Sequence, residues 1–564
     1  MIFQYKFLTI TAICSILIGC GSYKQFVPPE QLPGDRRNIP QPKERSSFND
    51  FSDAFDKQFV LQGEQFLDLS RHLRHVSDNP KEAYNINAFD EVPNSSWFTN
   101  RNGEKRMSLE ETIKGPDTCE GPDTSKTWTI IRAKAEGVTP GFTIIDSRGD
   151  KYVIKFDPIG YAGLNSGSEV IGSKIFYAAG YNVPENYICY FNPRILELGD
   201  KVKILDEKGR KRHMNREDLK MMLDRVEFLP NGLIRATASK YVEGKPIGPF
   251  KYEKVRRDDP NDFIPHQHRR ELRGLRVLAA WLNHIDSKAA NSMDTYFNEN
   301  EKSYVKHYLI DFGTILGSGG RGPQPKYRGY ENEIDPKAMT LRFFTFGLYS
   351  PRWERVPDRV EYPCVGRYYS DFYHPKKFKI IFPNPAYDNM TDRDGYWGAK
   401  LVMSFTDEQL RAIVREAQYP DAEAEEFLLE TMIERRDITG RYWFNRVCPL
   451  DNFIVTDYED GLQKLQFTDL AVETGLESAE KSVFRYSASL NGKTMIPLTE
   501  IGNRCEINLP DPTSFNSDGN YPVNQWELTL QVKRGNKGKW SKPVEVYMNQ
   551  TSDDKLKLVG LYRD

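Results

Sequence analysis

Two short segments of the sequence carry side chains that could act together in chemistry. Residues 284–291 read HIDSKAAN, and the triplet DFG, which begins at Asp311, follows further along the chain. An offset of two places the Asp286 carboxylate and the Lys288 ammonium on one side of an extended loop, where the first can accept a proton and the second can stabilise negative charge. The oxygens of Asn291 and Asp311 are ligands of the kind that hard cations such as Mg²⁺ prefer.

The elements around these segments must hold the four side chains together. The segment 269–283 is amphipathic and predicts a helix directly before the HIDSKAAN loop. The runs 292–297 and 304–310 surround the polar turn NENEKS and predict a hairpin that leads into DFG. We expect the arginines of the helix to form a solvated face; they are Arg269, Arg270, Arg273 and Arg276.

The order of a helix, a loop with Asp, Lys and Asn, a hairpin and DFG resembles the catalytic segment of protein kinases. On these residues the chain is similar to the protein-kinase-like superfamily, including its HipA-type and secreted kinase-like branches. The resemblance implies that Asp286 accepts the proton of an attacking hydroxyl and that Lys288 supplies positive charge near the transferred phosphoryl group. It also implies that Asn291 and Asp311 hold Mg²⁺ (or Mn²⁺) on the phosphates of ATP.

The same resemblance implies a small lobe upstream of the catalytic segment. Three short strands and a helix are predicted there, at residues 128–134, 142–146, 151–156 and 168–180. Lys155 on the third strand matches the family's lysine that reaches the α- and β-phosphates, and Glu169 at the start of the helix matches its ion-pair partner. Taken one at a time, a surface lysine and a first-turn glutamate stabilised by the helix dipole would explain both residues equally well.

Two further segments resemble ATP-binding parts of the family. Gly137 and Gly141 lie between the first two strands and imply a loop that covers the phosphates, although this loop departs from GxGxxG and contains Pro140. Tyr241 and Val242 resemble the hinge between the two lobes, where backbone groups meet the adenine edge.

The N-terminal sequence predicts export and attachment to a lipid. Residues 1–19 hold one lysine and an apolar stretch that is too short to span a bilayer. The tetrapeptide LIGC that ends at Cys20 resembles a bacterial lipobox, which implies acylation of the Cys20 thiol by palmitate or a similar chain and a lipid anchor in the cell envelope, at the outer membrane if the source is Gram-negative. An ordinary cleaved signal or a membrane anchor is the alternative.

Composition sets the number of domains and excludes some classes of partner. The chain has 564 residues, more than one core usually organises, and 39% of them are apolar. A formal net charge of −2 argues against a general nucleic-acid binder. We expect an α+β protein with a signal peptide (1–19), a tether (20–50), an N-terminal extension (51–125), a two-lobed kinase-like domain (126–455) and a small all-β, sandwich-like domain (460–564).

Three functions are compatible with these features. The first is an ATP- and Mg²⁺-dependent phosphotransferase that acts on a hydroxyl of an exported protein, lipid or glycan. The second is a non-catalytic pseudokinase scaffold or binding lipoprotein, since ATP should be scarce outside the cytoplasm. The third is transfer of a nucleotidyl group by the same fold with ATP reversed. The sequence does not choose the acceptor.

Two more segments carry expectations that a structure can test. His266 and His268 form an HxH pair, which we expect in a solvated loop rather than at a metal. The aromatic run 342–354 is expected to pack inside the large lobe rather than to shape a substrate groove.

Overall fold

The computed structural model describes residues 23–45, 50–77, 79–134, 140–205, 210–458, 462–514, 521–535 and 537–563. The chain forms two compact units. One comprises Gln31–Ile86 and Glu91–Arg446. We call it the catalytic unit because it contains the HIDSKAAN and DFG segments that resemble the catalytic segment of protein kinases. The other comprises Val447–Asp564 with the N-terminal residues up to Glu30 and Asn87–Asp90, and we call it the β unit. The division at Arg446 falls before the expected boundary at 455–460.

The small lobe of the catalytic unit is a six-stranded sheet with strand order β4-β8-β3-β2-β1-β5. Its strands are β1 (Trp128–Lys134), β2 (Gly141–Ile145), β3 (Lys151–Phe156), β4 (Asn186–Phe191), β5 (Leu196–Leu198) and β8 (Ile234–Lys240). All neighbours are antiparallel except β1 and β5, which are parallel. Apolar side chains that alternate along these strands form one buried cluster, as the period of two predicts. Helix α6 (Leu164–Ala179) follows β3.

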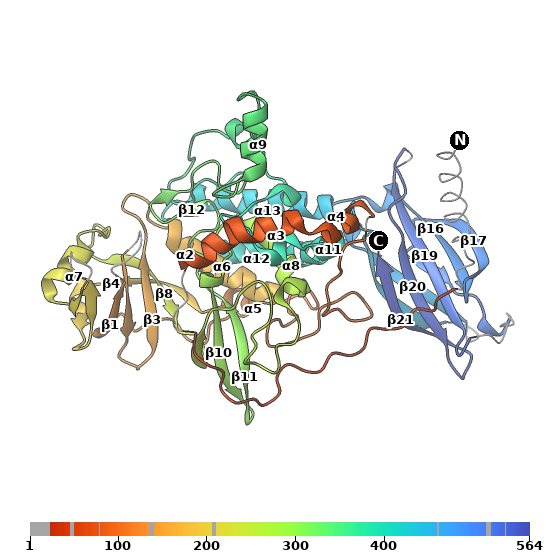
Figure 1. Ribbon diagram of the computed structural model, residues 1–564, viewed down its shortest axis with the longest axis horizontal. Coiled ribbons are helices and arrows are strands. Elements are labelled where there is room, and N and C mark those ends of the chain that lie inside the picture. Colours follow the sequence, from red (N-terminus) through yellow and green to blue (C-terminus); the bar gives the residue numbers. More distant parts are fainter. Residues whose placement is uncertain are drawn as a thin grey trace, which may run out of the picture. The chain divides into compact units, whose positions relative to one another are not determined.

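The large lobe is mainly helical (Figure 1). Its helices are α8 (Arg270–Leu282), α9 (Pro336–Phe344), α10 (Pro385–Asp388), α11 (Asp392–Met403), α12 (Asp407–Glu416) and α13 (Ala422–Phe444). Thr406 caps α12 in a capping box with Gln409, and Asp421 caps α13, as the sequence predicts. Helix α8 packs against α11 and α13, and its Leu275, Leu278 and Leu282 are fully buried.

A three-stranded sheet carries the catalytic segment between the lobes. Its strands are β9 (Lys245–Gly248), β10 (Ser292–Glu299) and β11 (Lys302–Leu309), in the order β11-β10-β9. The expected hairpin is therefore confirmed, because β10 and β11 pair in register from Ser292–Leu309 to Glu299–Lys302. Only Ile310 separates the end of β11 from Asp311, so the hairpin fixes the position of DFG.

The remaining elements of the catalytic unit are short. They are α2 (Asp50–Phe55), the π-helix η1 (Asp56–Val60), α3 (Leu61–Leu67), α4 (Leu69–Val76), α5 (Leu109–Lys114), β6 (Lys203–Leu205), β7 (Lys211–His213), α7 (Arg216–Leu223), β12 (Ser318–Gly319), β13 (Gly322–Pro323) and the 3-10 helices η2 (Pro193–Ile195), η3 (His266–His268), η4 (Ala289–Asn291), η5 (Arg352–Arg355) and η6 (Pro375–Lys377). The helical stretch expected near 51–76 is present as α2, η1, α3 and α4.

The segment expected as a free tether lies on the folded body where it is described. In the catalytic unit, the Ile39 amide donates to the Ser303 carbonyl and the Arg45 amide donates to the Ile247 carbonyl, both at 2.9 Å. In the β unit, the Phe26 ring stacks on Tyr547 with centroids 4.4 Å apart. The prediction of a detached tether is therefore wrong for residues 23–45, because their backbone and apolar groups find partners.

The arginines of α8 do not form the solvated face that we expected. The side chains of Arg270 and Arg273 are fully buried, and both pair with the buried Asp394 of α11 at 3.1 Å. Arg269 is also buried and contacts Asp262 at 3.4 Å. The prediction was wrong because Asp394, which pairs with Arg270 and Arg273, lies 124 and 121 positions further along the chain and cannot be recognised from the sequence around the helix.

Two smaller expectations are also wrong. His266 and His268 are buried rather than solvated, and His266 contacts the Asp262 carboxylate at 2.7 Å. The aromatic run at the end of α9 does not pack inside the large lobe, since Phe346 is 95% exposed and Phe343 is 76% exposed. Helix α9 projects from the rest of the large lobe (Figure 1).

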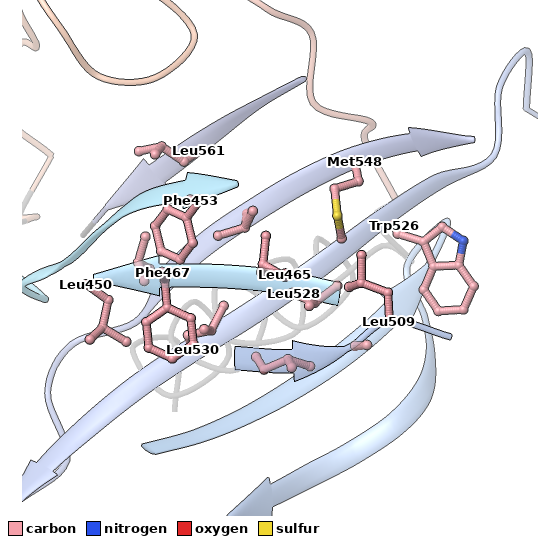
Figure 2. Close-up of a cluster of buried hydrophobic side chains, with 14 of the residues drawn as sticks. Leu450, Phe453, Leu465, Phe467, Leu509, Trp526, Leu528, Leu530, Met548 and Leu561 are labelled. Carbon is pink, nitrogen blue, oxygen red and sulfur yellow. The ribbon is translucent and has the colours of Figure 1, made fainter. Parts of the chain in front are cut away.

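The β unit contains two sheets around one core. Its strands are β14 (Leu450–Asp457), β15 (Gln463–Asp469), β16 (Ser482–Leu490), β17 (Lys493–Gly502), β18 (Glu506–Asn508), β19 (Gln525–Arg534), β20 (Val544–Gln550) and β21 (Leu556–Arg563), with the short helices α14 (Leu470–Glu473), η8 (Ala479–Lys481) and η9 (Pro512–Ser514). The sheet orders are β14-β15-β18 and β17-β16-β19-β20-β21. Figure 2 shows Phe467 of the smaller sheet and Leu528 of the larger one in the same buried cluster.

The order of these elements confirms the expected α+β class. A sheet-rich lobe precedes a helical lobe, and the catalytic segment joins them in the arrangement of a protein-kinase-like domain. Among the described residues, the structure has no helix that combines the length and apolar character needed to cross a membrane.

Candidate active site

Lys155 is held on β3 by strand alternation. Its neighbours Ile154 and Phe156 are buried in the sheet core, so the Lys155 side chain lies on the opposite face with 26% of its surface exposed. Gly141 on β2 is the direct cross-strand partner of Lys155. A Cβ atom at Gly141 would lie 2.7 Å from the Ile154 carbonyl oxygen, so the close approach of the two strands here requires glycine.

Glu169 faces Lys155 from helix α6. The Asp157 carboxylate accepts hydrogen bonds from the amides of Asn165 and Ser166 at 2.8 Å, which fixes the start of the helix one turn before Glu169. The Glu169 side chain is 98% buried, and its Oε1 lies 2.5 Å from Lys155 Nζ. The lysine–glutamate pair that the sequence predicts is thus formed.

Asp311 completes a cluster of three charges. Its Oδ1 lies 3.0 Å from Lys155 Nζ, and the amide of Phe312 donates to Glu169 Oε2 at 3.0 Å. The backbone of Asp311 has φ of 66°, a left-handed conformation that is uncommon outside glycine and occurs often at functional sites. Asp311 lies 156 positions after Lys155 in the sequence, so only the tertiary fold brings it to the Lys155–Glu169 pair.

The charges of this cluster control one another. Burial lowers the pKa of Lys155, but Asp311 and Glu169 outweigh it and raise the pKa above its usual value, so the ammonium stays charged. Burial raises the pKa of Glu169, and Lys155 opposes this rise. The cluster therefore keeps a permanent positive charge between two carboxyl groups in a partly enclosed site.

The HIDSKAAN loop places the three expected side chains side by side. Asn291 Nδ2 donates to the Asp286 carbonyl at 2.8 Å and to Asp286 Oδ2 at 3.1 Å. Lys288 Nζ lies 3.4 Å from Asp286 Oδ1. Burial raises the pKa of Asp286, and the nearby Asp311 raises it further against the opposing effect of Lys288. A carboxylate with a raised pKa is a better proton acceptor than an exposed one.

A stack of rings fixes the loop against α6. The Phe312 ring is fully buried and stacks on Phe176 with centroids 5.0 Å apart, and His284 lies 6.2 Å from Phe312. A Cβ atom on Gly172 would lie 2.5 Å from the Phe312 Cβ, so glycine at this position allows the ring to approach the helix. The stack joins the catalytic loop, DFG and the Glu169 helix into one block.

The donor set fits a divalent cation bound with phosphate. The Asn291 amide nitrogen is directed to Asp286, which leaves Asn291 Oδ1 as an oxygen ligand, and the Ile310 amide donates to the Asn291 carbonyl at 3.1 Å and so ties Asn291 to the segment before Asp311. The described residues contain no group of three or more His, Cys, Asp or Glu side chains that could hold a metal ion. Two protein oxygens are enough for Mg²⁺, which usually completes its shell with phosphates and water.

Two predicted site residues lie outside the part of the chain that the structure describes, and two others line a different pocket. Gly137 and Cys20 lie outside the described residues. Tyr241 and Val242 lie between β8 and β9 and line a pocket with Lys306 and Glu185, and none of Lys155, Glu169 and Asp311 lines that pocket.

Reasoning from the sequence missed several side chains that build the site. Asn165 donates to the Gly313 carbonyl at 3.2 Å, and Asn186 donates to the Glu169 carbonyl at 3.1 Å. Asp157, two residues after Lys155 and shortly before α6, is a cap signal that could have been found. The two asparagines carry no comparable signal, because their partners are distant in the sequence.

A second missed feature is a pocket beside the catalytic loop. It has a volume of about 230 Å³ and is lined by Ser287, Lys288 and Ala289 of the loop, by Asp53 and Lys57 of the α2–η1 helix, and by Phe382–Pro385. The lining is mainly apolar with a few charged groups, a composition typical of small-molecule sites. The segment 51–125, for which the sequence suggested no chemistry, thus forms one wall of a pocket at the active site.

No protein-family model matches the sequence, and no curated protein matches it. Solved structures similar to the chain include the Helicobacter pylori proinflammatory kinase CtkA, at 10% identity and a TM-score of 0.28, over 54% of this chain and 94% of CtkA. The Golgi casein kinase with Mn/ADP bound aligns at 10% identity and a TM-score of 0.29, over 72% of this chain and 94% of the kinase. A second structure of the Golgi casein kinase aligns at 10% identity and a TM-score of 0.28, over 74% of this chain and 96% of the kinase.

Proposed function

We propose that the chain is an ATP- and divalent-metal-dependent phosphotransferase that phosphorylates a hydroxyl group. The observation that carries the proposal is the contact of Lys155 Nζ with both Glu169 and Asp311, 2.5 and 3.0 Å away. This contact assembles a cation for phosphate oxygens and a carboxylate for a metal from three distant segments. A scaffold without catalysis would have no need of the Asp286 and Lys288 pair beside them.

The side chains would divide the work as follows. Lys155 binds phosphate oxygens of the nucleotide, and Glu169 keeps Lys155 in position. Asn291 Oδ1 and Asp311 would hold Mg²⁺ or Mn²⁺, which neutralises phosphate charge when it is bound. Asp286 accepts the proton of the attacking hydroxyl, and Lys288, 3.4 Å from the Asp286 carboxylate, stabilises negative charge on the transferred group.

The pocket beside Lys288 is the place where we expect the acceptor to bind. It adjoins the loop that carries Asp286, and its volume of about 230 Å³ accommodates part of a small molecule or one side chain of a protein. Asp53 Oδ1 has no hydrogen-bond partner among the described residues. An acceptor with a hydroxyl group would supply this missing partner.

We further propose that the acceptor is an exported protein, lipid or glycan. The support is the sequence that ends at Cys20, which resembles a lipobox and would anchor the protein to a membrane of the cell envelope. Incorporation of labelled palmitate by cells, with loss in a Cys20→Ser variant, would test the anchor. Absence of label in the wild-type chain would contradict it.

Phosphoryl transfer is tested directly with the full chain. With ATP labelled in the γ-phosphate and Mg²⁺ or Mn²⁺, we expect label in an acceptor fraction from the cell envelope, and we expect its loss with Asp286→Asn. Label that transfers from the α-phosphate instead would identify a nucleotidyl transferase. Binding of ATP without transfer to any acceptor would favour the pseudokinase scaffold.

A further inference from the structure

A second, smaller pocket lies in the large lobe and is unlike the pocket beside Lys288. It has a volume of about 40 Å³. Its wall comes from the loop after DFG at 324–330, from the segment 367–378, from Arg352 of η5 and from Arg435 of α13. Lys155, Glu169, Asp286 and Asp311 do not line it.

The wall of this pocket is strongly cationic. Six lysine and arginine side chains line it, and no aspartate or glutamate does; the six are Lys326, Arg328, Arg352, Arg367, Lys377 and Arg435. Tyrosine and phenylalanine rings, among them Tyr330, Tyr369 and Phe372, form much of the remaining surface. A wall of one sign of charge concentrates ions of the opposite sign.

Most of these cations are not neutralised within the protein. Arg328 pairs with Glu333 at 2.7 Å, and Arg367 pairs with Asp358 at 3.1 Å. Among the described residues, the other four have no carboxylate within ion-pair distance; they are Lys326, Arg352, Lys377 and Arg435. The pocket therefore holds an excess of positive charge that a bound anion would compensate.

Arg435 is the most constrained of the four. Its side chain is 95% buried between the rings of Tyr368 and Tyr373, with the guanidinium carbon 4.3 and 4.1 Å from their centroids. It donates to the carbonyls of Tyr369 and Ala280, and its Nε has no hydrogen-bond partner. A buried cation without a counter-charge is costly, and the surrounding contacts hold this one in a fixed orientation at the pocket.

The environment of His374 is consistent with this excess of cations. Burial lowers the pKa of His374, and Lys377 and Arg352 lower it further because they repel the imidazolium form. No carboxylate is among the groups that shift it. The histidine, which also lines the pocket, therefore experiences an environment dominated by the cations.

We propose that this pocket binds a phosphate group, either as free phosphate or as a phosphate monoester of a small molecule. A cavity needs roughly 10–15 Å³ of volume open to the centre of a water molecule in order to hold one water. The pocket has about 40 Å³ of this volume, so it admits a tetrahedral oxyanion in place of a few waters. Arginine and lysine form strong, charge-assisted hydrogen bonds with phosphate oxygens. The aromatic rings of the wall give a monoester an apolar surface for the group that carries the phosphate.

Equilibrium binding to the full chain tests the site without nucleotide or metal. The probes are inorganic phosphate and phenyl phosphate, each measured by calorimetry against sodium chloride at equal ionic strength. We expect saturable binding that Arg352→Gln weakens about tenfold, and that Arg352→Gln with Lys377→Gln weakens further. Tighter binding of phenyl phosphate identifies a monoester site, and equal or weaker binding identifies a free-phosphate site.

Two controls separate this pocket from other cationic groups. Arg359→Gln removes a nearby exposed arginine that pairs with Glu361 and does not line the pocket, and it should leave the affinity unchanged. Lys155→Met should also leave it unchanged, because Lys155 lies outside the pocket. The proposal is overturned if phosphate does not bind saturably, if the double variant binds as tightly as the wild type, or if Lys155→Met alone abolishes binding. Melting temperatures of all variants establish that they are folded.

Discussion

Two ionic clusters of the catalytic unit have opposite arrangements of charge. In the candidate active site, Lys155 lies between the carboxylates of Glu169 and Asp311. In the large lobe, Asp394 lies between the guanidinium groups of Arg270 and Arg273, 3.1 Å from each. The first cluster places one cation between two carboxyl groups, and the second places one carboxylate between two cations.

The clusters differ in their contact with solvent. The side chains of Asp394, Arg270 and Arg273 are completely buried, whereas 26% of Lys155 and 43% of Asp311 is exposed. A dry cluster can only stabilise or specify the fold. An open cluster can exchange water for a ligand, and its exposed Asp311 carboxylate suits a divalent cation. Exposure therefore separates the cluster that can only stabilise the fold from the one that can bind a ligand.

The largest effect that we expect is on stability, from Asp394→Asn. The change removes the buried carboxylate that contacts Arg270 and Arg273 at 3.1 Å and should lower the free energy of unfolding by about 3–5 kcal/mol. Denaturant unfolding of the full chain measures this loss of free energy. Asp392→Asn is the matched control in the same helical turn, because Asp392 pairs with Lys376 and Arg446 at a partly exposed site. A loss for Asp392→Asn equal to that for Asp394→Asn would remove the distinction between dry and open clusters.

The open cluster should show the opposite pattern with Lys155→Met. We expect phosphoryl transfer to fall by about 10²–10³-fold, since one preorganised charge for the phosphates is lost. The melting temperature should fall less than with Asp394→Asn, because Glu169, whose pKa burial raises, can become neutral by binding a proton. Lys151→Met tests the same strand at an exposed position and should leave the rate unchanged. A rate for Lys155→Met equal to the wild-type rate would contradict the assignment of the nucleotide site.

His284 should make the stability of the protein depend on pH, because its ring belongs to the stack that holds the catalytic loop, DFG and helix α6 together. Burial lowers the pKa of His284 to about 4, so the folded protein resists protonation that the unfolded chain accepts near pH 6.5. Stability is therefore complete above about pH 6.5 and should decline by roughly 3 kcal/mol as the pH falls from there to about 4.

Unfolding measured across this pH range in the wild type and in His284→Phe checks the effect. The variant should lose that part of the slope, and His213→Gln, at an exposed residue of β7, should keep it. The same slope in His284→Phe and in the wild type would assign the pH dependence to other groups.

The smallest effect is nucleotide-dependent stabilisation of the open cluster. ATP with Mg²⁺ at one hundred times its dissociation constant should stabilise the folded chain by about 2.7 kcal/mol. Thermal unfolding measures it, and Asp311→Ala should abolish it. The Asp394 cluster has no exposed face, so its substitution should leave this increment intact in the fraction of protein that folds. No shift with any nucleotide would move the assignment to a scaffold without ATP.

The parts of the site that the sequence predicted are those coded by local order. Asp286, Lys288 and Asn291 share one loop, and a hairpin with a recognisable turn leads from this loop to Asp311. Strand alternation around Lys155 was equally local. The structure confirms the elements that carry these residues and brings the side chains together.

The errors concern charges whose partners are distant. The spacing of Arg270 and Arg273 along the helix is also typical of a solvent-exposed face. Nothing near them in the sequence reveals that they pair with Asp394. For Phe346 we expected burial and the structure shows exposure. An aromatic run predicts burial, but it does not show which part of the chain would cover it.

The amino-acid sequence was sufficient to predict the α+β class, most of the strands and helices, and the loop and hairpin that connect Asp286 with Asp311. It did so because backbone periodicity and loop spacing are properties of neighbouring residues. Three features depend on the tertiary structure. They are which charged side chains are buried, the pocket beside Lys288 that the α2–η1 helix lines, and the second pocket that six cations from separate segments line. Burial and ion pairing depend on residues that meet only when the chain has folded, and no local pattern records those meetings.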